Sequence, residues 1–230
     1  MKNILQHYNT LRQVLRLPVA HLSFDRAIHP AQITATYRYY TMPHPRYKLI
    51  RHKSVGAALL DLEQMQSRAH YLDHIKGKNR GAGHARRASA RGYRFAEIDR
   101  NRHVDAIHAI NTSVDLRQGR PMDRQYLEKQ ERFEAYPHYR HYGMFNADGR
   151  LVGYADLGLF GNFAGFERLI GERNNDGFMH LLVIEIVAQL IEQKRLRYLM
   201  YDTFFGAQPG MRNFKTVLGF RPYRAKYSLL

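Results

Sequence analysis

Residues 177–205, GFMHLLVIEIVAQLIEQKRLRYLMYDTFF, and residues 210–227, GMRNFKTVLGFRPYRAKY, decide how this chain folds. The first stretch begins with an apolar run that is too uniform for a helix lying on a surface. It predicts a centrally packed helix over 177–194. The shorter aliphatic and aromatic run that follows the basic residues predicts a strand over 197–204.

The second stretch continues this alternation of helix and strand. A short helix is expected over 211–218, ended by Gly219, and a terminal strand over 220–227. Working upstream, the Asp-Gly pair at 148–149 is typical of a hairpin turn between two strands. The elements predicted before the long helix are a strand over 93–98, helices over 102–111 and 122–133, and strands over 141–146, 150–159 and 163–170.

The first 92 residues have a weaker pattern. A short amphipathic helix is expected before Pro18, and strands are expected over 32–41 and 47–51. The short apolar run over 55–62 fits a buried strand, but its periodicity leaves the type of element open. The polar and basic segment after them, interrupted by glycines, sets the boundary. We therefore expect an α+β fold with one mixed central sheet flanked by helices, in which 1–92 form a partial N-terminal subdomain and 93–230 the main domain.

Composition excludes several classes of protein. The chain has 230 residues, 44% hydrophobic and 24% charged, which is typical of a folded globular protein. It contains no Cys, which removes disulfides, thiol nucleophiles and Cys-based metal sites. No apolar run approaches the length of a membrane span, and the first residues lack the apolar core of a signal peptide. The expected location is the cytoplasm.

The charge is strongly positive and unevenly placed. The formal net charge is +16, and residues 1–150 hold 26 basic and 13 acidic side chains. The densest patch, residues 76–94, has no acidic residue. It predicts a phosphate-binding or nucleic-acid-binding face, with a merely solvated surface as the alternative. The residues assigned to this face are Lys76, Lys78, Arg80, Arg86, Arg87 and Arg91.

The carboxy-terminal half resembles the GNAT N-acyltransferase superfamily, and its Fem-type branch most of all. The resemblance rests on a Gly-aromatic opening of the long helix, a Tyr-Asp at the end of the next strand, and a Gly…Phe-Lys…Gly-Phe element before the last strand. These residues are Gly177, Phe178, Tyr201, Asp202, Gly210, Phe214, Lys215, Gly219 and Phe220. The segment RGAGHARRASARGYRFAEID, residues 80–99, is similar to the basic helix that such proteins place before a strand.

The resemblance implies a GNAT-type sheet and transfer of an acyl group to an amine without a covalent intermediate. Two donors stay open. Acetyl- or other acyl-coenzyme A is usual in the superfamily, whereas Fem-type enzymes use aminoacyl-tRNA. The Gln/Arg-x-x-Gly-x-Gly/Ala loop of coenzyme A-dependent members is absent here, because Arg173 and Gly177 in GERNNDG stand four residues apart instead of three.

Three residues are expected to be catalytic. Tyr201 would return a proton to the leaving group, Asp202 would orient or deprotonate the amine, and Lys215 would bind a phosphate or stabilise the oxyanion. Each has a structural alternative: a core aromatic residue, a turn cap and a surface lysine respectively.

Other residues are expected to bind the donor and the acceptor. The start of the long helix would face the donor's phosphates or ribose, and the residues assigned to this role are Arg173, Asn175, Asp176, Gly177, Phe178 and Phe214. A plain helix cap is the alternative. Arg117 and Arg120 would clamp a carboxylate or phosphate, and Glu185 would contact substrate from within the apolar helix. The alternative for all three is a side chain that simply faces solvent.

Other chemistries are less well supported. No HExxH, GxSxG, P-loop or GxGxxG motif occurs, and no metal site is expected. The acceptor amine, a small molecule or peptide, is not identified by the sequence. Two non-enzymatic alternatives remain: an RNA-binding module that uses the basic patch, and a pseudoenzyme that keeps the fold with an empty donor site.

Overall fold

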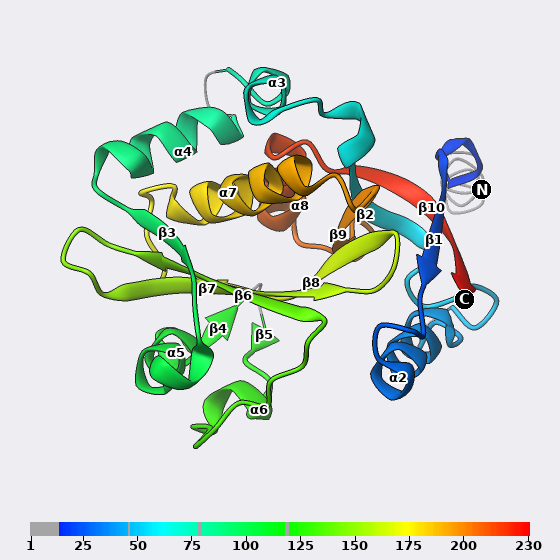
Figure 1. Cartoon of the computed structure of the whole chain (residues 1–230), viewed down its shortest axis with the longest axis horizontal. Coiled ribbons are helices and arrows are strands. Elements are labelled where there is room, and N and C mark those ends of the chain that lie inside the picture. The colour runs from blue at the N-terminus through cyan, green and yellow to red at the C-terminus, as the bar shows by residue number, and fades with distance from the viewer. Residues whose placement is uncertain (1–13, 46, 78–79, 118–119) are drawn as a thin grey trace, which may run out of the picture.

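Eight strands form one mixed sheet that runs through the whole molecule (Figure 1). The computed structural model describes residues 14–45, 47–77, 80–117 and 120–230, with only the backbone of 117 and 120. The strands of the sheet are β1 (Val19–Phe24), β2 (Val55–Asp61), β3 (Arg94–Glu97), β6 (Tyr139–Phe145), β7 (Leu151–Leu159), β8 (Phe163–Gly171), β9 (Tyr198–Thr203) and β10 (Arg221–Leu229). Their order is β1-β10-β2-β9-β8-β7-β6-β3. The structure thus confirms the predicted mixed sheet.

The remaining elements cover the two faces of the sheet. The helices are α2 (Pro30–Thr41), α3 (Arg68–His74), α4 (Gly81–Ala90), α5 (Val104–Thr112), α6 (Arg124–Leu127), α7 (Phe178–Gln193) and α8 (Pro209–Val217), with short 3₁₀ turns η1 (Leu62–Gln64) and η2 (Arg100–Arg102). A small hairpin pairs β4 (Leu116–Arg117) with β5 (Arg120–Pro121). Only two pairs in the large sheet are parallel, β1 with β10 and β8 with β9.

The long helix α7 organises one face. Ten of its residues are buried, which is why its sequence shows no polar stripe. It packs between the sheet and helices α3 and α4 in the largest apolar cluster. The opposite face has two separate covers: α2 packs on β1, β2, β9 and β10, and α5 packs on β7 and β8 (Figure 1). The middle of that face, over β8 and β9, is therefore left between the two covers.

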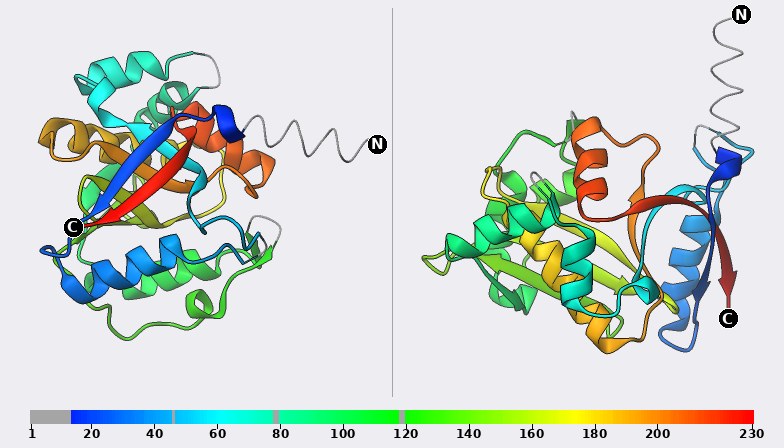
Figure 2. Two further views of the ribbon diagram at one scale, coloured as in Figure 1. Left: turned by 90° about the vertical axis from the view of Figure 1, so that its right-hand side faces the viewer. Right: turned by 90° about the horizontal axis from the view of Figure 1, so that it is seen from above.

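Two strands from the first 92 residues enter the main sheet. β1 runs parallel to the last strand, with Val19 opposite Arg224, and β2 lies between β10 and β9 (Figure 2). The Asn162 side chain joins β1 to the turn before β8: its Oδ1 accepts from Ser23 N at 2.8 Å and its Nδ2 donates to His21 O at 3.0 Å. The domain boundary at residue 92 remains a prediction.

Several predicted elements are confirmed. They are the strands at 93–98, 141–146, 150–159, 163–170, 197–204 and 220–227, and the helices at 102–111, 177–194 and 211–218, each with bounds shifted by a few residues. The apolar run at 55–62, whose type the sequence left open, is strand β2. The basic segment that was expected to form a helix before a strand does so as α4 and β3. Most of the amphipathic helix expected before Pro18 lies outside the described residues.

The strand predicted over 32–41 is wrong, because this segment is helix α2. Alternating Ile, Tyr and Thr residues favour a strand, but Ile33, Tyr37 and Tyr40 also fall on one helical face and pack on the sheet. Pro30 at the first position and the His29 cap start the helix.

Two other predictions are also wrong. The strand predicted over 47–51 is a turn that is held to Pro43 by one bridge. The helix predicted over 122–133 shrinks to Arg124–Leu127, since residues 128–132 are all polar and exposed and offer no apolar face to the sheet.

Replacing Asn162 with Ala tests the connection to β1. The substitution removes both side-chain hydrogen bonds, and we expect the free energy of unfolding to fall by about 1 to 2 kcal/mol. Urea denaturation measures this, with Asn213→Ala on the exposed face of α8 as the control. Equal stability of the two variants would contradict a stabilising role for Asn162.

Candidate functional site

The central strands β8 and β9 separate part of the way along the sheet. They pair in parallel at only three positions, Phe163 with Tyr198, Ala164 with Leu199, and Gly165 with Met200. Beyond these pairs the two strands continue apart. Phe166 and Tyr201 face each other across the opening, with ring centroids 5.4 Å apart and an interplanar angle of 69°.

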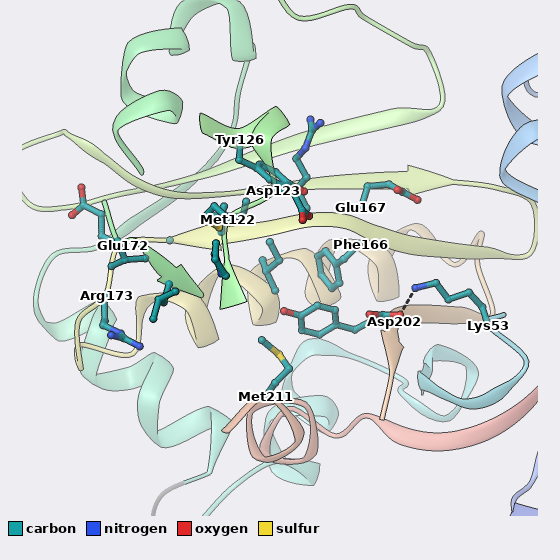
Figure 3. A pocket seen from close by; sticks show the side chains of 18 of the residues that line it. Lys53, Met122, Asp123, Tyr126, Phe166, Glu167, Glu172, Arg173, Asp202 and Met211 are labelled. Atoms are coloured by element: carbon teal, nitrogen blue, oxygen red, sulfur yellow. Dashed lines mark hydrogen bonds and ion pairs between the residues drawn. The ribbon is translucent and has the colours of Figure 1, made fainter. Parts of the chain in front are cut away.

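A β-bulge in β8 lies next to this opening. Opposite β8, Asp156 pairs with Arg168 and the following Leu157 pairs with Phe166, so that Glu167 is the extra, unpaired residue. A bulge bends its strand and redirects a side chain. Here the redirected Glu167 lines a cavity over the opening (Figure 3).

Three adjoining cavities surround the opening, and each is lined in part by Tyr201 and Met211. The central cavity, of about 460 Å³, lies between α2, residues 114–116 and 121–126, and β8. The helix-end cavity, of about 770 Å³, lies at the start of α7. The lysine cavity, of about 550 Å³, lies beside the loop from β9 to α8.

Lys215 is buried beside Tyr201, and only 2% of the residue is exposed. Its Nζ donates to Thr203 O at 2.8 Å and lies 4.8 Å from the centroid of the Tyr201 ring. Burial lowers the pKa of the Lys215 ammonium to about 8. Burial likewise raises the pKa of the Tyr201 hydroxyl, with a smaller contribution from Asp202, so that Tyr201 keeps its proton at neutral pH.

Asp202 ends β9 in the left-handed backbone region, with a φ of 53°. Asp tolerates this conformation better than most residues, and such positions are common at functional sites. Its carboxylate forms an ion pair with Lys53, which comes from the segment between α2 and β2. The three residues predicted to be catalytic therefore meet around one opening, although Asp202 already has a cationic partner.

Glu167 was missed by the sequence analysis. Within the part of the chain that the structure describes, its carboxylate has no hydrogen bond or ion pair. The surrounding protein displaces part of its water and raises its pKa above the ordinary value, although the side chain still reaches solvent through the open cavity. Lys53 and Arg168 counteract this effect in part. The signal in the sequence is a pair of charged residues inside the otherwise apolar strand 163–171.

Asp156 of β7 lies opposite Arg168 of β8, next to the bulge. This buried carboxylate accepts from Arg100 Nη1 at 2.9 Å, from Arg168 Nη1 at 3.0 Å and from His141 Nδ1 at 2.7 Å. Burial alone would raise the pKa of Asp156, but the His141 hydrogen bond and the two arginines hold it below its ordinary value. The cluster was also missed, and an aspartate within the apolar strand 151–159 was its only signal.

The helix-end cavity contains most of the residues predicted to bind a donor. Its lining includes Arg173, Asn175, Gly177, Phe178 and Phe214. Gly177 caps α7 without a side-chain hydrogen bond and has a φ of 86°. A Cβ atom there would lie 2.5 Å from His84 O, so this glycine serves both the helix start and the close packing of α4.

Asp176 lies elsewhere. Its carboxylate accepts from Tyr93 Oη at 2.6 Å and forms an ion pair with Arg91, which ties the loop before α7 to the end of α4. The wall of the helix-end cavity includes His180, which stacks on His84 with ring centroids 4.3 Å apart. Burial, together with the charges of His84 and Arg87, lowers the pKa of His180 to about 4.

The residues predicted to bind substrate are dispersed. Glu185 forms an ion pair with Arg68 of α3 and lines none of the three cavities. Arg117 and Arg120 belong to β4 and β5, and their side chains lie outside what the structure describes. The hairpin itself borders the central cavity through Leu116 and Pro121.

The predicted nucleic-acid residues follow α3 and α4. Lys76, Arg80, Arg86, Arg87 and Arg91 are exposed, whereas Lys78 lies outside the described residues. Lys76 and Arg91 are partly neutralised by Asp73 and Asp176. Arg87 also lines the helix-end cavity, so the basic surface reaches its edge.

Two further searches cover the described residues only. Among them, no group of three or more His, Asp or Glu side chains is placed to hold a metal ion. None of the described helices combines the length and the apolar character needed to cross a membrane.

Comparison with known proteins identifies the fold alone. No protein-family model matches the chain, and no curated protein matches it. FemX matches with a TM-score of 0.57 and 8% identity over 85% of this chain and 66% of FemX. A protein of unknown function from Bacteroides thetaiotaomicron matches with a TM-score of 0.52 and 16% identity over 73% of this chain and 56% of its own.

A third match is the C-terminal domain of a proposed lysylphosphatidylglycerol synthetase from Agrobacterium fabrum, with a TM-score of 0.50 and 15% identity over 73% of this chain and 58% of that one. The chain thus spans less than two thirds of the length of each of these structures. It has a GNAT-like fold of the Fem type, which confirms the fold that the sequence resemblance predicted.

Lys215→Met tests whether the buried charge is costly. At pH 7 we expect the free energy of unfolding to rise by about 2 kcal/mol, because the variant no longer buries an ammonium. Between pH 8 and 10.5 the unfolded wild type binds more protons than the folded form, so its stability rises and the difference narrows.

Urea denaturation at pH 7 and pH 10 measures this effect. Lys226→Met, at an exposed position of β10, is the control and should change stability little at either pH. A less stable Lys215→Met variant at pH 7 would contradict a costly buried charge.

Proposed function

We propose that this protein is an N-acyltransferase that moves an acyl or aminoacyl group from an activated ester or thioester to an amine by direct attack. The observation that carries the proposal is the meeting of Glu167, Tyr201 and Lys215 at the opening between β8 and β9. A proton acceptor, a proton donor and a cation are the groups that such a transfer requires.

The reaction divides among these groups. The amine enters the central cavity, and Glu167 accepts the proton that the nitrogen loses as it attacks the donor carbonyl. The Lys215 ammonium stabilises the negative charge that develops on the carbonyl oxygen. Tyr201 gives a proton to the leaving oxygen or sulfur and regains one from solvent. We assign proton acceptance to Glu167 rather than to Asp202 because Asp202 is paired with Lys53.

Two reasons favour Lys215 and Glu167 as functional groups. The buried ammonium of Lys215 lowers the stability of the folded state, and an uncharged side chain of similar size would fill the same space at a lower free-energy cost. The Glu167 carboxylate lies on the bulge without a hydrogen bond or ion pair among the described residues, and its raised pKa makes it a stronger proton acceptor than an ordinary glutamate.

Aminoacyl-tRNA is the donor that we place first, and acyl-coenzyme A is the second. Both carry phosphates that suit the start of α7. The exposed basic side chains of α3 and α4 extend the positive surface well beyond a small cofactor and end at the helix-end cavity through Arg87. The spacing of Arg173 and Gly177 also departs from the coenzyme A loop.

Thermal melting with candidate donors tests this assignment. We expect charged tRNA to raise the melting temperature more than deacylated tRNA, and the shift to weaken with salt. The same melting experiment is carried out with acetyl-coenzyme A and with free coenzyme A. Saturable stabilisation by coenzyme A or acetyl-coenzyme A alone would make acyl-coenzyme A the donor instead of aminoacyl-tRNA. Stabilisation by RNA without any acyl transfer would favour an RNA-binding module. No response to any donor would favour a pseudoenzyme.

Glu167→Gln tests the proton acceptor. The side chain keeps its size but cannot accept the proton, so kcat/KM should fall by about 10²- to 10⁴-fold. The acidic limb of the pH profile, which reports protonation of Glu167, should disappear as well.

Glu192→Gln, at an exposed position near the end of α7, is the matched control for this variant. Unchanged turnover in Glu167→Gln would remove this residue from the mechanism.

A further inference from the structure

The lysine cavity gathers nitrogen-bearing side chains from separate parts of the chain. His44, His52 and Lys53 come from the segment between α2 and β2, and Lys215 comes from α8. The only carboxylate in its lining is that of Asp202. Among the lining residues two ammonium groups therefore face one carboxylate.

Lys215 has no ion-pair partner among the described residues, although the charge of Asp202 acts on it from a distance. An ammonium has three N–H donors, and within the described residues the structure gives it one acceptor, Thr203 O. The aromatic rings of Tyr201 and Phe204 are its other neighbours, with centroids at 4.8 and 5.8 Å. Asp202 is bonded to Lys53 instead. An anion in the cavity would supply the missing partner.

The start of α8 adds to this preference. Gln208 caps the helix without a side-chain hydrogen bond and also lines the lysine cavity. A helix N-terminus carries a partial positive charge, which favours an anion beside it. The cations and the helix end therefore act in the same direction on one cavity.

The lysine cavity lies away from the donor end of the site. In Figure 3, Arg173 and Glu172 lie on one side and Lys53 and Asp202 on the other, with Met211 between them. The donor's phosphates are assigned to the start of α7, at the Arg173 side. An anion near Lys53 would thus belong to the second substrate.

We propose that the lysine cavity binds an anionic group, a carboxylate or a phosphate, that is carried by the acceptor amine. The assignment of this anionic group to the acceptor amine rests on the proposed function, whereas the binding of an anion in the cavity does not. The acceptor's nitrogen would lie beside Glu167 and its anionic group between Lys53 and Lys215. Since Thr203 O takes one of the three N–H donors of Lys215, one donor serves this anion and one is left for the oxyanion of the donor carbonyl. The substrate class is then an amine with an acidic group on the same molecule, and neutral amines or diamines are poor acceptors.

Binding of inorganic phosphate and of acetate tests the cavity without any transfer reaction. Titrations are followed calorimetrically at constant ionic strength, adjusted with chloride, for the wild type, Lys53→Met, Lys215→Met and Lys226→Met. The Lys226 variant loses the same charge at an exposed site on β10. Phosphate or acetate should bind the wild type and Lys226→Met alike, and at least 10-fold more weakly to Lys53→Met and Lys215→Met.

Two outcomes would overturn the anion site. Equal affinity of all four proteins would show general attraction to a chain of net charge +16, and no binding to the wild type would remove the site altogether. Comparison of the phosphate and acetate titrations decides between the two anions. Tighter binding of phosphate indicates a phosphate on the acceptor, and tighter binding of acetate indicates a carboxylate. Circular dichroism confirms that each variant is folded.

Two further arms test the acceptor assignment. Phosphate binding that persists with the donor at saturation supports an acceptor site, and its loss would assign the cavity to the donor. With an active enzyme, an amino acid should exceed its amide in kcat/KM by at least 10-fold, and Lys53→Met should abolish the preference. Equal use of both acceptors would overturn the assignment. Anion binding that depends on Lys53 without any transfer would support the anion site and overturn the proposed function instead.

Discussion

The parting of β8 from β9 is the constraint on which the rest of the site depends. Parallel pairing holds these strands together for three residues, and the bulge at Glu167 then turns β8 away. The apolar cluster around α7 covers one face of the sheet throughout, so the strands can separate without exposing the core on that side. On the other face α2 and α5 leave the middle uncovered. The opening is therefore reachable from solvent and rigidly supported from behind.

The charged side chains around this opening differ in whether they have a partner. Asp156 accepts hydrogen bonds from two arginines and from His141, whereas Glu167, its neighbour across the bulge, has no such partner among the described residues. Lys53 neutralises Asp202, and Lys215 is left with a carbonyl and two rings. Full pairing would stabilise the fold more than this arrangement does. Unpaired groups are retained where a substrate can pair with them, which is the usual compromise between stability and function.

The sequence located the residues near the opening only where a local pattern marked them. Tyr201 and Lys215 belong to the family-like motifs, and Gly177 stands before an apolar run that can only be a buried helix. Glu167 was not found because its lack of a partner depends on the bulge in β8, which no local pattern in the sequence marks. Lys53 escaped because it lies 149 residues from Asp202 and nothing local indicates that the two meet.

The sequence by itself determined the mixed α+β class, the buried helix α7, the hairpin of β6 and β7 and the final strand, because each depends on local periodicity and turn chemistry. Only the tertiary structure decided that 30–41 forms a helix, since its aromatic residues suit either period and the sheet selects one. It alone decided that β1 and β2 lie on either side of β10, and that three cavities meet at Tyr201. These features depend on contacts between distant segments, which no local pattern encodes.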